Sequence, residues 1–341
     1  MIDGIVDFHV HSGPSILPRR RDDPDAVAEA RGTGVDRLVL KAHEGSTAER
    51  AALAGAGISG GIVLNSPVGG CNPDAVEVCA RLGGRVVWLP TVSSAAHQAA
   101  AGSAALAVHR GVRLRQVPVL DDGAPARGLD EVLDLVAAHD LILASGHVPV
   151  GDAVRIFQAA HARGARRFLV NHPTFDFMNW NDDLFDPLAK LDVRLEVGCV
   201  ADLDTTPADS PTMRLATAYP TSLLVLGSDL GHTSFPDYRE GLTTWFRGLA
   251  PHLGEEALHP DHGRERPIVP GRVGRGRALG ATSGLGRSVP CATADQRRRG
   301  SVQSPFWSPL TTDHRGRQPS RVMIDPAPKG HLTSTDAYRR R

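Results

Sequence analysis

Residues 1–258 repeat one pattern eight times: a short apolar run, a polar or glycine-containing turn, and a stretch with helical periodicity. Most of the apolar runs are nearly continuous in Val, Ile and Leu, which is typical of parallel strands buried on both faces. This alternation of strand and helix predicts an α/β protein. The expected strands are Ile2–Phe8, Arg37–Leu40, Gly61–Leu64, Val86–Leu89, Leu141–Ala144, Arg167–Val170, Val193–Val197 and Leu223–Gly227.

Several of the helical stretches begin with Asp, Ser or Pro and end near Gly, the usual start and stop signals. Eight such units predict a (β/α)8 barrel, the TIM barrel. An open, doubly wound sheet stays an alternative, because periodicity does not distinguish a closed sheet from an open one. The segment Ser93–Arg127 is too long for one connection and is a candidate for an extra strand or hairpin. The expected helices are Asp25–Gly32, Ala48–Ala54, Pro73–Leu82, Leu129–Ala138, Gly151–Arg163, Asp182–Leu191, Pro211–Ala218 and Tyr238–Leu249.

Composition narrows the class of protein further. The chain has 341 residues, 41% of them apolar and 22% charged, which suits a globular protein with a substantial core. Its four cysteines form no C-x-x-C pair, so neither a disulfide framework nor a thiolate zinc site is indicated, and a cytoplasmic setting fits best. The N-terminus lacks a signal-peptide pattern and no apolar run reaches about 18 residues, so secretion and membrane insertion are not expected.

The charge is unevenly distributed along the chain. Residues 259–341 hold 16 Lys and Arg against 6 Asp and Glu, are rich in Gly, Pro and Ser, and show no sustained periodicity. The expected organisation is a barrel over residues 1–258 followed by a basic, low-complexity tail, either disordered or the product of an out-of-frame reading of a GC-rich gene. Nucleic-acid binding by this tail is not favoured, because aromatic residues are sparse in it.

The carboxyl ends of the expected strands carry an unusual set of polar residues. The first strand runs into DFHVH, which places His9 and His11 two residues apart and therefore on one face of the strand. Later strands run into SGH, NHP and GSD, which contain His147, His172 and Asp229. Because the active site of a (β/α)8 barrel is assembled at this end of the strands, the five side chains are expected to converge. Their joint register indicates a metal site more strongly than any one of them does.

Other candidates are weaker when taken one at a time. Lys41 directly follows an apolar run, where a charge is costly. His43, a candidate for substrate binding, and Glu44 follow it in a loop where Glu44 also suits a helix cap. The arginines at positions 19–21 follow the first strand, and Arg20 is the candidate among them for binding an anionic substrate. His232, just after GSDLG, is a further candidate for substrate binding. The remaining histidines of the barrel region are interpreted as structural or surface residues: His97, His109, His139 and His161.

With these motifs in place, the sequence over about residues 1–255 resembles the amidohydrolase superfamily. The segments DFHVHSGPS, LVLKAH, GGIVLNSPVGGCNP, VVWLPTV, SGH, NHP and GSDLG are similar to an uncharacterised group of metal-dependent hydrolase-like proteins within it. The resemblance implies a divalent ion held by His9, His11, His147 and Asp229, with His172 binding a second ion or polarising the substrate. The expected fourth strand ends in WLPTVSS and lacks the bridging Lys or Glu of the binuclear members, so a single ion is expected and carbamylation of Lys41 stays open.

Three imidazoles and one carboxylate suit Zn²⁺, with Mn²⁺, Fe²⁺ or Ni²⁺ as alternatives. A zinc site of this kind lowers the pKa of bound water to about 7, and Asp229 can move the proton. We therefore expect hydrolysis of an amide, ester or lactone bond in a small molecule, with His172 and Lys41 stabilising the oxyanion.

A metal-dependent decarboxylase, a phosphoesterase and a degenerate barrel that only binds a partner stay open as alternatives. The sequence leaves the substrate undetermined. It also leaves open whether the chain forms a homo-oligomer.

Overall fold

The computed structural model describes residues 5–100, 114–203 and 205–253. All of them fall in the first of two units of the chain, Met1–Val273. The expected tail at residues 259–341 and the histidine His109 lie outside the described residues.

The strands that form the centre of the fold pair only in parallel, as the runs of Val, Ile and Leu predict. The hydrogen-bonded order is β1-β2-β3 in one sheet and β11-β10-β9-β8-β5-β4 in another. The strands are β1 (Ile5–His11), β2 (Val35–Lys41), β3 (Ile58–Ser59), β4 (Gly61–Val63), β5 (Val86–Trp88), β8 (Ile142–Ala144), β9 (Phe168–Val170), β10 (Arg194–Val197) and β11 (Leu224–Leu226).

Two junctions join these sheets into a closed ring. Strands β3 and β4 are separated only by Gly60, where an added Cβ would lie 2.2 Å from the Thr47 carbonyl oxygen, so a side chain is excluded. On the other side, β1 meets the chain after β11 through a parallel bridge between Val10 and Leu230. There the His11 amide donates to the Leu230 carbonyl at 2.9 Å. The sheet is therefore a closed (β/α)8 barrel, and the open-sheet alternative is excluded.

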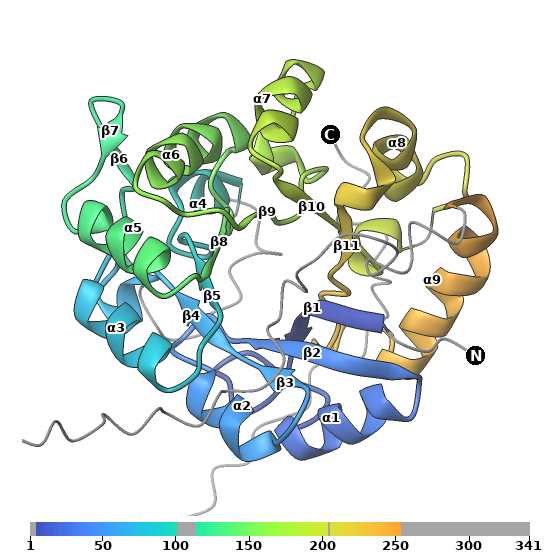
Figure 1. Ribbon diagram of the computed structural model, residues 1–341. Helices are drawn as coiled ribbons and strands as arrows, with labels where there is room; N and C mark the ends of the chain where they lie inside the picture. Colours follow the sequence, from blue (N-terminus) through green and yellow to red (C-terminus); the bar gives the residue numbers. More distant parts are fainter. Residues whose placement is uncertain (1–4, 101–113, 204, 254–341) are drawn as a thin grey trace, which may run out of the picture. The chain divides into compact units, whose positions relative to one another are not determined.

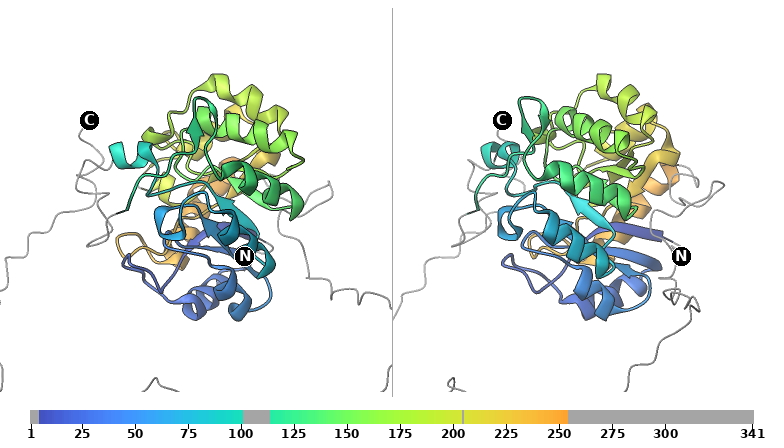
Figure 2. Two further views of the ribbon diagram at one scale, coloured as in Figure 1. Left: turned by 90° about the vertical axis from the view of Figure 1, so that its left-hand side faces the viewer. Right: turned by 60° about the vertical axis from the view of Figure 1, so that its left-hand side comes forward.

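Helices surround the strands, as Figure 1 shows from one end and Figure 2 from two further sides. Side-chain caps begin three of them: Asp22 accepts from the Asp25 amide, Asn72 from Ala75 and Ser210 from Met213. In the described residues, no helix is long and apolar enough to cross a membrane. The helices are α1 (Asp23–Arg31), α2 (Ala48–Ala54), α3 (Pro73–Arg81), α4 (Ala95–Ala100), α5 (Leu129–Ala138), α6 (Val150–Ala162), α7 (Phe185–Lys190), α8 (Pro211–Ala218) and α9 (Tyr238–Leu253).

The apolar core has two parts. The larger cluster combines strand and helix residues and fills the space between the barrel and its helices. In the smaller cluster every buried member is on a strand, so this cluster fills the inside of the barrel. Its buried members are Phe8, Val39, Val63, Val86, Trp88, Ile142, Ala144, Leu169 and Val225.

Two segments differ from the expectation in an informative way. The hairpin expected within Ser93–Arg127 is present as β6 (Leu120–Asp121) and β7 (Ala124–Pro125), but the same segment also holds the short helix α4. Strand β1 extends to His11, three residues beyond the expected end, and its register with β2 shifts between Asp7 and Val10. The Asp7 carboxylate accepts from the amides of His9 and Ser228, both at 3.0 Å, and so stabilises this irregularity.

Candidate metal centre

Polar side chains from four barrel strands or the turns after them gather at the carboxyl end of the barrel. Strand β1 supplies His9 and His11, and β10 supplies Glu196. His172 follows β9 and Asp229 follows β11. The four residues other than Asp229 are at most 6% exposed, and the Asp229 side chain is 16% exposed. The structure thus brings together four of the five strand-end residues that the sequence singles out.

Three ligand atoms meet at the centre of this group. The Nε2 atoms of His9 and His11 lie 3.1 Å apart, and the Asp229 Oδ1 atom lies 3.1 Å from the first and 3.2 Å from the second. Two ligands bound at zinc distances of about 2.1 Å in a tetrahedron would be about 3.4 Å apart. The spacing of the three atoms therefore suits a small divalent ion.

The outer ring nitrogens fix which atom of each imidazole carries a proton. His9 Nδ1 lies 3.1 Å from Glu196 Oε1, and His11 Nδ1 lies 2.8 Å from the Lys41 carbonyl oxygen. Since both partners are acceptors, each Nδ1 donates a proton, and the Nε2 atom of each ring faces Asp229. Burial holds the pKa of His11 well below its usual value, so this ring is neutral near pH 7. Three converging lone pairs repel one another unless a cation lies among them.

Glu196 also holds the third histidine of the group. Its Oε1 atom lies 3.2 Å from His172 Nδ1, and its Oε2 atom accepts a hydrogen bond from the side-chain amide of Asn171 (Nδ2) at 2.6 Å. His172 Nε2 is consequently directed towards the centre, 3.8 Å from Asp229 Oδ2. Carboxylates that accept from the outer nitrogen of ligand histidines orient the rings and raise their basicity. We assign this role to Glu196, although His9, His172 and Glu196 also have the spacing of a metal-binding group.

The electrostatics of the two carboxylates agree with this arrangement. Burial tends to raise the pKa of Asp229, but the neighbouring His9 and His172 outweigh it and hold the value well below its usual range. The pKa of Glu196 is lowered in the same way by His9 and His172 against its burial. Burial lowers the pKa of His172 to about 4. At neutral pH the site therefore presents a neutral His172 and two ionised carboxylates, the forms that bind a metal ion.

The backbone at two of these residues is strained. His172 has φ 46° and Asp229 has φ 57°, in the left-handed region that residues other than glycine rarely adopt. Such conformations cost about 1–3 kcal/mol each and are concentrated at functional sites. The ring of His172 is stacked on Phe175, with centroids 4.7 Å apart and planes 8° from parallel, which fixes its orientation.

His147 lies beside the three-atom centre and belongs to neither group with metal-binding spacing in the described residues. Its ring centroid is 5.5 Å from that of His172, and its Nδ1 atom is 2.8 Å from Nδ1 of His97. His97, on α4, is 5% exposed. His43 Nδ1 lies 2.8 Å from the Thr91 hydroxyl oxygen, and its ring centroid is 5.0 Å from that of His11. His147 and His43 thus lie beside the centre formed by His9, His11 and Asp229.

Lys41 is 1% exposed, and its Nζ atom has no hydrogen-bond partner among the described residues. It lies 5.5 Å from the centroid of the Trp88 ring. Burial lowers the pKa of Lys41 to about 8, against the opposing effect of Glu196 and Asp229. Within the described residues, this buried amine is therefore hydrogen-bonded to neither of the two carboxylates that act on it through space.

Three other residues that the sequence singled out, Arg20, His232 and Glu44, lie in different surroundings. Arg20 is exposed, and its guanidinium donates to the carbonyl oxygens of Thr233, at 3.2 Å, and Phe235. His232 is partly buried, and its Nε2 atom has no partner in the described part of the chain. Glu44 accepts from the Ser15 hydroxyl at 2.7 Å rather than capping a helix. In the structure, Arg20 therefore stabilises the loop at residues 233–235 through hydrogen bonds.

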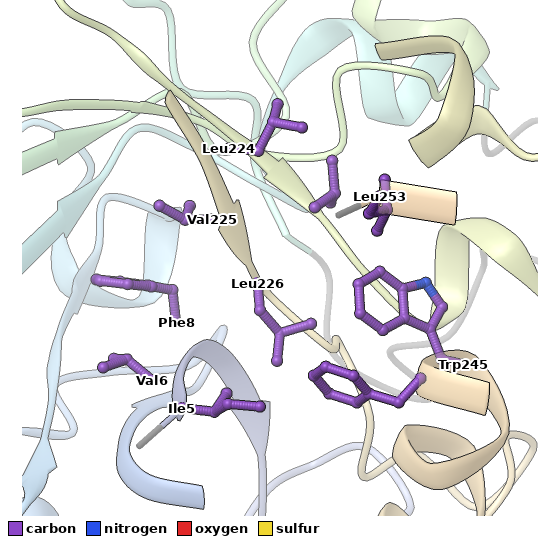
Figure 3. Close-up of a pocket in the computed structure, with 10 residues that line it drawn as sticks. Ile5, Val6, Phe8, Leu224, Val225, Leu226, Trp245 and Leu253 are labelled. Carbon is purple, nitrogen blue, oxygen red and sulfur yellow. The ribbon is translucent and has the colours of Figure 1, made fainter. Parts of the chain in front are cut away.

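A separate apolar hollow lies away from this polar cluster (Figure 3). It is lined by residues of β1, β10, β11 and α9, among them Phe8, Leu226 and Trp245. Its volume of about 20 Å³ is close to that of a single water molecule, which is too small for a substrate. It contains no ionisable group, and we interpret it as a packing gap.

A family of unknown function (DUF6282) matches residues 4–196. This is more than half of the chain. The chain belongs to this family. The match includes His9, His11, His147, His172 and Glu196, whereas Asp229 lies beyond it. No curated protein matches the sequence.

Several solved structures of other proteins have a backbone similar to part of this chain. The TatD homologue YJJV of Escherichia coli is 18% identical, over 76% of this chain and 96% of its own, with a TM-score of 0.44. The 5-carboxyvanillate decarboxylase LigW of Sphingomonas paucimobilis is 10% identical, over 77% and 97%, with a TM-score of 0.47. An amidohydrolase of Pseudomonas aeruginosa is 14% identical, over 71% and 78%, with a TM-score of 0.46. These likenesses are too distant to transfer a reaction.

Sequence reasoning missed Glu196, and it gave no indication that His97 is buried against His147. Glu196 had a signal: it is an acidic residue between Leu195 and Val197 in an expected buried strand, where a charge is costly unless it is paired. His97 had none, because it lies on a short helix in a segment whose helical character the sequence did not indicate.

Proposed function

We propose that the protein is a metal-dependent hydrolase of the amidohydrolase superfamily, acting on an amide, ester or lactone bond of a small molecule in the cytoplasm. The observation that carries the proposal is the convergence of His9 Nε2, His11 Nε2 and Asp229 Oδ1 within 3.2 Å of one another, with both outer imidazole nitrogens bonded to acceptors. Such a set of lone pairs favours one divalent ion, and zinc is the best match to two imidazoles and a carboxylate.

The residues that would hold the ion are His9, His11 and Asp229, with His172 directed at the same centre and His147 and His43 as further imidazoles beside it. When bound there, a divalent ion supplies a Lewis acid and lowers the pKa of a water molecule towards neutrality. Asp229 is ionised and can accept a proton from the attacking water and return it to the leaving group.

Two cationic or polar groups are placed to act on the substrate. Lys41 Nζ is buried and has no partner in the described residues, so it can donate to an oxygen on which negative charge develops. His172 is oriented by Glu196 and Phe175, and because its proton is held on Nδ1, its Nε2 atom faces the centre as a lone pair that can accept a proton or bind a second ion. Glu196 keeps the protons of His9 and His172 on their outer nitrogens.

The test is a reconstitution with Zn²⁺, Mn²⁺, Fe²⁺ or Ni²⁺ followed by a screen of small amides, esters, lactones and aromatic carboxylic acids, with separate assays for hydrolysis and for CO2. Hydrolysis that requires the metal and disappears in Asp229→Asn supports the proposal. Metal-dependent release of CO2 without hydrolysis would replace it with a decarboxylase. A protein that is loaded with metal and catalyses neither reaction would contradict the enzymatic interpretation.

A further inference from the structure

Three consecutive arginines follow β1, and the structure gives each a different environment. Arg20 donates to carbonyl oxygens of the loop at residues 233–235, and Arg21, with a side chain 49% exposed, pairs with Glu29 at 3.6 Å. Arg19 differs from both, because its Nε and Nη2 atoms are buried and have no hydrogen-bond partner among the described residues. No ion pair within 4.0 Å involves Arg19 in that part of the chain either.

Backbone contacts hold Arg19 at the edge of the metal centre. The segment that contains it is fixed by a bridge between Gly13 and Asp22 and by a second one between Arg19 itself and His232. His232 is three residues after Asp229, so Arg19 lies against the segment that supplies this ligand. Its charge is, after burial, the second cause that lowers the pKa of His11.

The nearby carboxylates do not neutralise this guanidinium. Asp229 and Glu44 act on Arg19 through space without an ion pair in the described residues: the Glu44 Oε1 atom accepts from the Ser15 hydroxyl and the Ile16 amide, at 2.7 and 3.0 Å, and its Oε2 atom is buried without a partner there. Burial lowers the pKa of Arg19 to about 10, so it stays charged at neutral pH. Buried charged groups without partners are costly, and natural proteins keep them chiefly where a ligand completes the pairing.

The two unpaired nitrogens identify the chemistry of that ligand. Nε and Nη2 are adjacent on one edge of the guanidinium, the edge that binds a planar carboxylate through two parallel hydrogen bonds. We propose that Arg19 binds a carboxylate of the substrate, so that the substrate is a carboxylic acid whose second functional group reacts at the metal centre. His232 Nε2, also buried without a partner in the described residues, lies on the neighbouring backbone segment and is the second donor of this subsite. The inference rests on the proposed function, because it assumes that a substrate bridges Arg19 and the centre.

Binding of two small probes to the zinc-loaded protein tests the subsite without an assay of activity. Acetohydroxamate binds metal centres and has no charged group beyond its hydroxamate, whereas the monohydroxamate of succinic acid adds a carboxylate. Calorimetric titration should show at least about tenfold tighter binding of the second probe, the ratio that one charge-assisted hydrogen bond supports. In Arg19→Gln this preference should disappear, with the affinity for acetohydroxamate and the zinc content unchanged. The matched control, Arg21→Gln, should keep the preference.

Equal binding of both probes by the wild type, or a preference that persists in Arg19→Gln, would overturn the proposal. A wild type that binds no zinc would instead contradict the proposed function, and Arg19 is then tested in the metal-free protein. Succinate, but not succinamide, should protect Arg19 from modification by phenylglyoxal, as mapped by mass spectrometry. Equal modification in the presence of either compound would overturn the carboxylate subsite independently of the metal.

Discussion

The inside of the barrel has two halves of opposite chemistry, built on the same strands. Towards the amino ends of the strands it is filled by apolar side chains such as Phe8, Ile142 and Leu169, while at the carboxyl ends it holds His9 and Glu196. In β1, Phe8 and His9 are consecutive, and the register shift there lets one strand serve both halves. The comparison indicates that the apolar half provides stability and that the polar half is kept, at some cost in stability, for chemistry.

The largest effect is expected from Asp229→Asn in the polar half. The change removes a ligand charge and the proton acceptor, so turnover should fall by at least about a thousandfold. Circular dichroism should change little, because the substitution conserves shape, while the thermal stability of the metal-free protein should fall at neutral pH, because the lowered pKa of Asp229 means that its ionised form stabilises the fold. An Asp229→Asn variant that keeps more than about a tenth of the wild-type activity would remove this residue from the mechanism.

Ile142→Ala makes the corresponding change in the apolar half. Ile142 is 2% exposed, so the lost packing and the cavity should lower the free energy of unfolding by about 2–5 kcal/mol. Urea unfolding measures this loss, and elemental analysis of the folded variant should find the same zinc content as in the wild type. If the zinc content fell together with the stability, the two halves would not be separable.

Lys41→Met tests the boundary between the two halves. The Lys41 amine lies over the ring of Trp88, which belongs to the apolar half. Folding lowers the pKa of Lys41 from 10.5 to about 8, so the unfolded chain binds the proton more tightly and the buried amine destabilises the protein below about pH 8. As the pH rises from about 8 to 10.5, the wild-type unfolding free energy should therefore rise relative to that of the variant, by about 3 kcal/mol. Urea unfolding of the metal-free proteins at several pH values measures the difference, and curves that stay parallel would contradict the assigned environment.

Glu196→Gln is expected to weaken metal binding without abolishing it. The neutral amide orients His9 and His172 less firmly, and loss of such partners typically costs about 10–100-fold in metal affinity. Competition with a zinc chelator measures the affinity, and Glu131→Gln on the exposed side of α5 is the matched control. A complete loss of zinc in Glu196→Gln would instead make Glu196 a direct ligand.

The smallest effect is expected outside both halves. Leu53 on α2 is 90% exposed, so Leu53→Ser should change the unfolding free energy by less than about 0.5 kcal/mol and leave metal binding unchanged. Thermal unfolding detects a larger change, which would indicate that this face of α2 is covered by a partner.

Much of the fold was predictable because burial on both faces leaves a continuous apolar signal in each strand. All eight expected strands are present, and the helix Ala48–Ala54 has the predicted bounds. The closed barrel was predicted from the eight repeats and is confirmed, but the open sheet stayed an alternative, since closure depends on long-range pairs such as Val10 with Leu230. At the site, His9, His11, His172 and Asp229 come together as their strand-end positions predict. Arg19 could not be distinguished from Arg20 and Arg21, because consecutive loop residues carry no periodic signal.

The central claim is that His9, His11 and Asp229 hold one divalent ion, and elemental analysis of zinc tests it most directly. The wild type and a His9→Ala, His11→Ala double variant would be incubated with zinc, passed through gel filtration, and compared for bound metal and for helix content. We predict about one equivalent in the wild type and almost none in an equally folded variant. A wild type without zinc, or a variant that retains it, would contradict the account.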